Sequence, residues 1–326
     1  MMYLEVVAGL VVLLFGGEAL VRGAIGLAER LRLSKLVIGL TVVALGTSAP
    51  ELVVCIEAAL EGVPDIAIGN VVGSNIANVL LVLGLPALIY PINCSFDGPV
   101  RRNSAMMVLA TLLLVAVGWT RELTAWEGAI FVLLLVAFIV YSYHQARLHG
   151  DRSPVALTEE LETGTPTSFW LAAIFVGGGL VALAVGSNLL IDGAVEVAEA
   201  AGLSQTVIGL TLVAVGTSLP ELATTIVAAW HRHGDVAVGN IVGSNMFNIL
   251  GVMGVTALVA PVPVPQQILH FDAWVMLAVA VVMLLLVMYG RPIGRLVGCV
   301  FSVVYGAYVA AQFYGLSGVH PQVAGL

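Results

Sequence analysis

The feature that most constrains the fold of this chain is a six-residue motif that occurs twice within apolar sequence. The two copies are Gly46-Thr47-Ser48-Ala49-Pro50-Glu51 and Gly216-Thr217-Ser218-Leu219-Pro220-Glu221, and the spacing from Glu51 to Glu221 defines a repeat offset. Other residues recur at the same repeat offset without a gap: Leu33-Ser34 as Leu203-Ser204, Val37 to Thr41 as Val207 to Thr211, Gly69-Asn70 as Gly239-Asn240, Gly73-Ser74-Asn75 as Gly243-Ser244-Asn245, and Asn78 as Asn248. The chain is therefore an internal duplication, and each feature of one copy has a counterpart in the other.

The first copy lies in an apolar run, residues 36–60, that is long enough to cross a bilayer. A carboxylate such as Glu51 within such a run costs at least about 2.5–3.5 kcal/mol to insert and is normally functional. Pro50 lacks an N–H and its ring collides with the carbonyl group of Gly46, so we expect a broken helix. Free carbonyl groups, hydroxyls and a carboxylate form an all-oxygen environment that suits hard cations such as Ca²⁺ or Na⁺. The alternative is a kinked helix whose hydroxyls bond to their own backbone, and the repetition of the motif weakens it.

The composition is that of a polytopic membrane protein, because 60% of the residues are hydrophobic and only 10% are charged. The net charge of −8 therefore does not indicate a nucleic-acid partner, and no basic patch suggests one. The three cysteines lack the spacing of a disulfide framework or a zinc site: Cys55, Cys94 and Cys299. The histidines fall in or beside loops, and we expect solvated side chains even at His231 and His233, where a metal site is the alternative. The first apolar run has no basic segment before it and contains Glu5, so a retained helix is expected.

Runs of about 20 apolar residues predict ten transmembrane helices and an all-α polytopic fold. The first five helices are expected at about residues 4–28, 36–60, 66–90, 103–119 and 125–143. The second five are expected at about residues 168–198, 206–230, 236–260, 271–290 and 294–315. This predicts a first five-helix repeat over residues 1–143, a short polar linker over 144–167 and a second five-helix repeat over 168–326.

Lysine and arginine residues fall almost entirely on one side of the predicted membrane. With the amino terminus outside, ten of them lie on the cytoplasmic side: Arg30, Arg32, Lys35, Arg101, Arg102, Arg147, Arg152, Arg232, Arg291 and Arg295. Arg121 lies outside, and Arg22 lies within the first helix, where it can pair with Glu18 one turn away. This positive-inside bias predicts a plasma-membrane protein with both termini outside and the linker in the cytoplasm.

Because each repeat has five helices, an odd number, the second repeat must cross the membrane in the opposite direction to the first. Inverted repeats are typical of secondary transporters, which bind ions near the midplane where broken helices meet. The third and eighth helices bring a serine and an asparagine four residues apart, and therefore on one helix face: Ser74 with Asn78, and Ser244 with Asn248.

The first and sixth helices are rich in glycine. The glycines are Gly9, Gly16, Gly17, Gly23 and Gly26 in one helix and Gly177, Gly178, Gly179, Gly186 and Gly193 in the other. Small residues allow close helix approach. They indicate either static packing or a smooth surface on which the two helices slide past a fixed core, and the sequence leaves both open.

The paired GTSxPE motifs, each followed by GNxxGSNxxN, resemble the two alpha repeats of the sodium/calcium exchangers, prokaryotic type, in the cation/calcium antiporter superfamily. The motif-bearing regions cover about residues 33–84 and 203–254. The resemblance implies a transporter rather than an enzyme, one that moves Na⁺ inward and Ca²⁺ outward by alternating access. Ca²⁺ and Na⁺ are then transported ions, no cofactor is expected, and the lipid bilayer is the expected surrounding.

The resemblance also implies a set of ion ligands. The calcium site would comprise Glu51, Glu221, Thr47 and Thr217. The flanking sodium sites would use Ser48, Ser74, Ser218 and Ser244, with backbone carbonyls near Ala44 and Ala214 and the amides of Asn78 and Asn248 at the centre. Many members carry an aspartate at the position of Asn248, and the potassium-dependent members use such an acid, so K⁺ independence is expected here.

The charge of the predicted pocket favours the exchange of several Na⁺ for one Ca²⁺. Two glutamates give −2, which one Ca²⁺ cancels, whereas one Na⁺ would leave a charge uncompensated at low dielectric. Several Na⁺ must therefore replace one Ca²⁺, and the resemblance implies three. Three Na⁺ would leave the pocket at +1, so we expect electrogenic exchange.

Two other functions remain open from the sequence. A proton-coupled divalent-cation antiporter could use the same glutamates, which would take up protons when Ca²⁺ leaves. A cation channel needs a continuous pore and weak binding at several sites, and inverted broken helices around one buried site argue against it.

Overall fold

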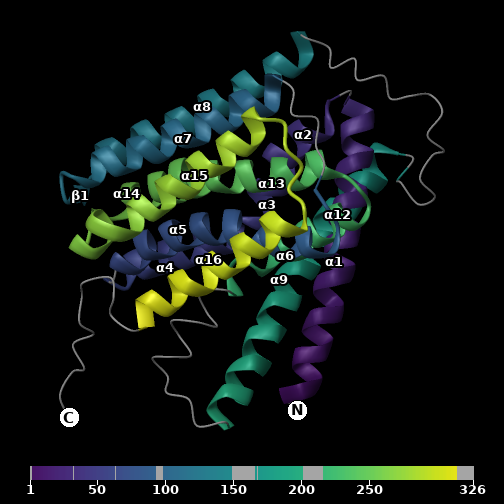
Figure 1. Cartoon of the computed structure of the whole chain (residues 1–326), viewed down its shortest axis with the longest axis horizontal. Helices are drawn as coiled ribbons and strands as arrows, with labels where there is room; N and C mark the ends of the chain where they lie inside the picture. The colour runs from purple at the N-terminus through teal and green to yellow at the C-terminus, as the bar shows by residue number, and fades with distance from the viewer. Residues whose placement is uncertain are drawn as a thin grey trace.

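The computed structural model describes residues 2–31, 33–62, 64–92, 98–148, 166, 168–200 and 216–313. Within this part, the protein is almost entirely helical (Figure 1). Eight helices are long and apolar enough to cross a membrane, and a ninth span is a helix pair bent by 41° at a break, counting only described residues. The predicted all-α membrane fold is confirmed, and the start of the remaining predicted span, 206–230, lies outside the described residues.

The helices of the first repeat lie where the apolar runs predict them. Its elements are α1 (Met2–Leu31), α2 (Lys35–Ile38), the π-helix η1 (Gly39–Val43), α3 (Ala44–Thr47), α4 (Ala49–Leu60), α5 (Asp65–Ala77), the π-helix η2 (Asn78–Val82), α6 (Gly84–Ile89), α7 (Gly98–Gly118), β1 (Glu122–Leu123) and α8 (Ala125–Leu148). α7 begins five residues earlier than predicted and α8 ends five residues later, because both helices continue past the apolar run into polar residues.

The described helices of the second repeat follow in the same order as their counterparts in the first. The elements are α9 (Phe169–Ala200), α12 (Leu219–Trp230), α13 (Gly234–Met246), the π-helix η4 (Phe247–Val252), α14 (Met253–Val259), β2 (Val262–Pro263), the π-helix η5 (Ile268–Asp272), α15 (Ala273–Met288) and α16 (Arg295–Phe313). β2 precedes α15, whereas β1 follows α7. Most of the predicted linker lies outside the described residues, so the boundaries 1–143, 144–167 and 168–326 stay predictions.

Apolar side chains point outward over much of the surface. Exposed large side chains include Phe15, Leu133, Trp170, Leu296 and Val303. Such a surface would aggregate in water but matches lipid tails, and each helix satisfies its own backbone hydrogen bonds, as the hydrocarbon region requires. The buried polar side chains are instead concentrated in α3, α4 and α12, and in the two membrane spans whose first helices are α5 and α13.

Two short strand contacts show the inverted symmetry of the repeats. β1 pairs with β2 in antiparallel register, with Leu123 opposite Val262. A second bridge joins Ile92 to Ile293. Ile293 follows Leu123 by the repeat offset, and Val262 follows Ile92 by the same offset, so each contact is the image of the other. All four side chains are buried, and these contacts tie together the loops at the ends of the core helices.

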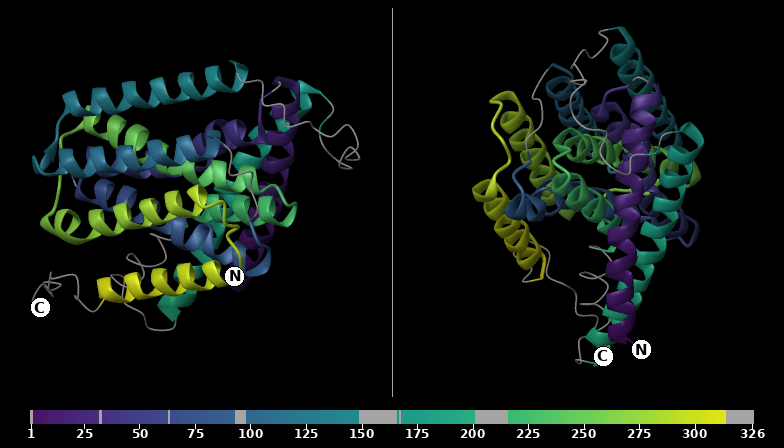
Figure 2. Two further views of the ribbon diagram at one scale, coloured as in Figure 1. Left: turned by 45° about the horizontal axis from the view of Figure 1, so that its top comes forward. Right: turned by 90° about the vertical axis from the view of Figure 1, so that its right-hand side faces the viewer.

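α1 and α9 lie side by side and cross the direction of α7, α8, α15 and α16, which run nearly parallel to one another (Figures 1 and 2). Glycines bring the two backbones together: a Cβ at Gly9 would lie 2.6 Å from Leu190 N, and one at Gly179 would lie 2.6 Å from Leu20 N. Gly16 lies next to Gly179 in the same way. These glycines therefore let α1 and α9 pack closely against each other, so that the two helices form one unit.

Candidate cation site

The helix that carries the first motif breaks at the serine of the motif. α3 ends at Thr47, α4 begins at Ala49, and Ser48 between them has φ −85° and ψ 5°. Ser218, before α12, has φ −88° and ψ 5°. The motif proline lies in the first turn of both α4 and α12, where its missing N–H costs no helical hydrogen bond. The predicted break is confirmed in the first copy, and in the second copy α12 begins after a serine with the same backbone geometry.

Each break places a glutamate in the first turn of the helix that follows, Glu51 in α4 and Glu221 in α12. Free N–H groups and the helix dipole favour negative charge at this end. Both glutamates are 0% exposed, and their carboxylates lie close enough to interact electrostatically. Two buried negative charges side by side are unfavourable unless a positive charge accompanies them.

Glu221 accepts hydrogen bonds from one serine of each repeat. Ser48 Oγ lies 3.2 Å from Glu221 Oε1, and Ser244 Oγ lies 3.4 Å from the same oxygen. Ser244 Oγ also lies 3.4 Å from Thr47 Oγ1, and either hydroxyl can donate. These contacts connect four of the predicted ligands into one cluster between the repeats.

Seven buried oxygen atoms of the predicted ligands have no hydrogen-bond partner within the described residues. They are both Oε atoms of Glu51, Oε2 of Glu221, Oγ of Ser74 and Ser218, and Oδ1 of Asn78 and Asn248. Each unsatisfied buried group costs about 1–3 kcal/mol, and more when charged. Ca²⁺ typically takes about 6–8 oxygen ligands. The oxygens present therefore fit a hard cation that would satisfy them.

The central asparagines lie in π-helical segments at equivalent places in the two repeats. Asn78 begins η2 and Asn248 is the second residue of η4. π-segments within α-helices frequently mark functional sites, because they turn side chains and carbonyls out of regular register. Asn78 donates through Nδ2 to Asn245 Oδ1 at 3.0 Å, which links the two repeats.

The structure adds asparagines that were not among the predicted ligands. Thr47 donates through Oγ1 to Asn240 Oδ1 at 3.3 Å, and Thr217 donates to Asn70 Oδ1 at 3.4 Å. Thr217 and Asn240 follow Thr47 and Asn70 by the repeat offset, so the two hydrogen bonds are images of each other. Both asparagines lie in the repeated motif, and that recurrence was the signal that could have identified them. They orient the threonines across the repeat interface.

The remaining predicted ligands have no hydrogen bond to either glutamate among the described residues. The carbonyl oxygen of Ala44 accepts from Ser48 N at 3.0 Å and from Thr47 Oγ1 at 3.4 Å. Ala214 lies outside the described residues. Ser74 and Ser218 are buried near the breaks, but no hydrogen bond joins either one to a glutamate in the described part of the chain.

One expectation about the histidines is wrong. His233 is buried rather than solvated, because Lys35 Nζ lies 3.2 Å from its Nδ1 and the loop folds against the helix ends. His231 is half-buried and contacts Glu18. Among the described residues, no group of three His, Cys, Asp or Glu side chains could hold a metal ion. A cation between the two glutamates would therefore rely on hydroxyl, amide and carbonyl oxygens.

The α1–α9 unit covers one of two symmetry-related faces of the core. A Cβ at Gly17 of α1 would lie 3.1 Å from Ala223 O and 3.3 Å from Val227 Cγ2 of α12. Ala223 is 5% exposed, whereas Val53, its counterpart on α4, is 53% exposed. Among described residues α9 makes no comparable contact with α4. α1 therefore covers α12, whereas α4 has no comparable cover from α9 among the described residues.

Comparison with known proteins gives one consistent family. The chain matches the family described as "Sodium/calcium exchanger protein" over residues 2–144 and 171–314. It is 39% identical to a putative antiporter, CaxA, of Alkalimonas amylolytica, over 93% of this chain and 96% of that protein. It is 34% identical to the sodium/calcium exchanger MaX1 of Methanosarcina acetivorans, over 96% of this chain and 98% of that one.

The fold is similar to that of a solved exchanger. A structure of the sodium-calcium exchanger NCX_Mj soaked with Na⁺ and Ca²⁺ has a TM-score of 0.81 and 30% sequence identity, and covers 95% of this chain and 98% of that chain. The same protein soaked without either ion has a TM-score of 0.82. The similarity extends over nearly the whole length of both chains.

Proposed function

The chain belongs to the sodium/calcium exchanger family, and we propose that it is a multi-pass membrane antiporter that exchanges Na⁺ for Ca²⁺ by alternating access. The observation that carries this proposal is the pair of fully buried glutamates, Glu51 and Glu221, surrounded by oxygens without protein partners among the described residues. A site buried on all sides fits a transporter that encloses its ions, and it does not fit the continuous pore of a channel.

In the proposed arrangement Ca²⁺ binds between the two glutamates. The threonines of the breaks, Thr47 and Thr217, complete the shell, and their hydrogen bonds to Asn240 and Asn70 support this role by holding both hydroxyls between the repeats. The proposed Na⁺ ligands are the serines Ser48, Ser74, Ser218 and Ser244. The carbonyls of Ala44 and Ala214 would add oxygens, and the amides of Asn78 and Asn248 would occupy the centre without adding charge.

Transport of Na⁺ and Ca²⁺ is tested with the purified chain in vesicles loaded with Na⁺ and diluted into radioactive Ca²⁺. We expect rapid Ca²⁺ uptake that needs the Na⁺ gradient, and no uptake driven by a pH gradient without Na⁺. The rate should not change when K⁺ is replaced by choline, because neither central asparagine supplies the acid that potassium-dependent members use. Uptake driven by protons alone would contradict the proposal and favour a proton-coupled antiporter.

The same vesicles test whether exchange moves net charge. With Ca²⁺ bound the two glutamates are neutralised, and with three Na⁺ bound the site carries +1. Moving one charge is worth about 2.3 kcal/mol per 100 mV. With K⁺ and valinomycin setting the potential, inside-positive vesicles should accumulate Ca²⁺ faster than inside-negative ones, because positive charge leaves with Na⁺. Equal rates at both potentials would instead indicate two monovalent ions per Ca²⁺.

We also propose that the protein lies in the plasma membrane with both termini outside and the linker in the cytoplasm. The distribution of lysine and arginine supports this orientation. Single cysteines introduced between residues 150 and 165 should react only with thiol reagents that cross the membrane, when tested in intact cells. Labelling of these cysteines by an impermeant reagent added outside would contradict the orientation.

A further inference from the structure

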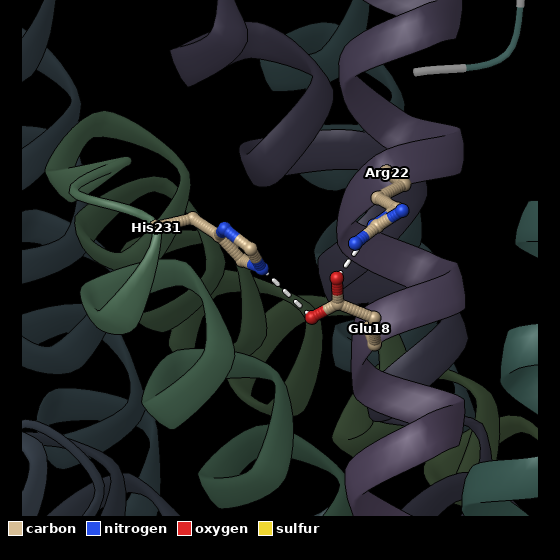
Figure 3. A network of polar contacts seen from close by, with 3 residues as sticks. All are labelled: Glu18, Arg22 and His231. Atoms are coloured by element: carbon tan, nitrogen blue, oxygen red, sulfur yellow. Dashed lines mark hydrogen bonds and ion pairs between the residues drawn. The ribbon is translucent and has the colours of Figure 1, made fainter. Parts of the chain in front are cut away.

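A charged network joins α1 to the end of α12 (Figure 3). Glu18 of α1 accepts a contact from Arg22 Nε at 2.5 Å on Oε1, and its Oε2 lies 2.8 Å from His231 Nε2. His231 directly follows α12 and caps its carboxyl end. All three side chains are only partly exposed. The network therefore fastens the α1–α9 unit to the core on the face that this unit covers.

The repeat offset identifies the corresponding positions on the less covered face. Glu18 corresponds to Asn188 of α9, Arg22 to Asp192, and His231 to Glu61 after α4. All three counterparts are exposed, unlike the network residues. An amide between two carboxylates offers no ion pair, and the two acids repel each other. These residues therefore provide electrostatic attraction between the α1–α9 unit and the core on the α12 face, and their counterparts provide none on the α4 face.

The difference between the two faces matters because, in a transporter with inverted repeats, the conformation open to one side of the membrane is related by symmetry to the conformation open to the other side. Alternating access moves one unit against the other around a fixed site. The conformation that opens to the other side of the membrane can be approximated by giving each repeat the conformation of the other repeat. α9 would then cover α4 and bring Asn188 and Asp192 toward Glu61, while Glu18 would move away from His231.

We propose that Glu18, Arg22 and His231 form a one-sided latch, the α1 latch, which holds the transporter closed along α12. This inference rests on the proposed function only in assuming that α1 and α9 move during transport. On the proposed orientation the latch lies on the cytoplasmic side, so it would favour the conformation open to the outside.

The test uses cysteine reporters on the two faces of the full-length chain. Val227→Cys places a thiol under α1, and Val53→Cys places one on the less covered face of α4. Cys94 and Cys299 are replaced by serine, and the buried Cys55 is kept. The rate of reaction with N-ethylmaleimide is measured on detergent-solubilised protein at fixed Na⁺ and without Ca²⁺.

We expect Glu18→Gln and His231→Gln each to raise the labelling rate at Val227→Cys by about two- to fivefold, the range for a partly exposed ion pair. Labelling at Val53→Cys should fall. The double variant should match the single variants, because both remove the same contact. Glu29→Gln, which removes an exposed carboxylate from the same helix, serves as the matched control and should change neither rate.

Equal labelling rates at Val227→Cys in the Glu18→Gln and Glu29→Gln backgrounds would overturn the latch. Labelling does not require transport, so a failed Na⁺/Ca²⁺ assay would leave this result standing.

Discussion

Replacing either Glu51 or Glu221 by glutamine is expected to lower Ca²⁺ exchange by roughly 100-fold or more. Each glutamate is buried in the first turn of a helix, and the two carboxylates lie close enough to interact electrostatically. An amide keeps the size and one acceptor oxygen but removes the charge that balances Ca²⁺. Leaving a buried ion without its partner costs about 3–5 kcal/mol, and 1.4 kcal/mol corresponds to tenfold.

The measurement is Na⁺-driven uptake of radioactive Ca²⁺ into vesicles containing each variant, with gel filtration to show that the protein remains folded. Folding should survive, because removing an unpaired buried charge does not destabilise the protein in the absence of ions. Glu57→Gln is the matched control, since Glu57 lies on the same helix as Glu51 but is exposed. Exchange at near wild-type rate in either Glu51→Gln or Glu221→Gln would mean that the two glutamates do not share one ion.

The second large effect is expected in the α1–α9 unit. A Cβ at Gly179 would lie 2.6 Å from Leu20 N and 2.9 Å from Gly16 O, and both of these are backbone atoms that no rotamer change can move. Gly179→Ala should therefore separate the two helices and destabilise the protein by about 1–3 kcal/mol, the usual cost of overpacking.

Gly178→Ala is the matched control for this substitution. Gly178 is the neighbouring residue on α9, is exposed, and has no atom within 4 Å of the position that a Cβ would occupy. Alanine favours helix over glycine by about 1 kcal/mol, so Gly178→Ala should keep or raise the midpoint of thermal unfolding in detergent, while Gly179→Ala lowers it. If both variants unfold at the same temperature, the glycines do not hold α1 against α9.

Much of the fold could be predicted because the bilayer leaves few choices. A span needs about 20 apolar residues and must satisfy its backbone within the helix, so apolar runs marked the helices to within a few residues. Where prediction and structure differ, as at the start of α7 and the end of α8, the helix continues into polar residues that a count of apolar residues excludes.

The site could be predicted where its residues recur in both repeats. Glu51 and Glu221 stood out because a carboxylate beside a proline has no structural use within an apolar span, and the repeat offset paired them. Asn70 and Asn240 recur with the motif but do not stand out as ligands, because an amide has no such conflict with its surroundings. Their contacts with Thr217 and Thr47 join residues from opposite repeats.

The sequence alone determined the duplication, the spans, the two helix breaks and the class of ion that the oxygens suit, since each of these depends on residues that are close together in the chain or on the bilayer. Only the tertiary structure decided how the copies meet: which hydroxyls reach Glu221, that Gly9 and Gly16 of α1 face α9, and that α1 covers α12. The physical reason is symmetry. The motif is the same in both inverted copies and so does not distinguish the two faces, whereas the contact between Glu18 and His231 joins distant residues that the repeat does not conserve in type.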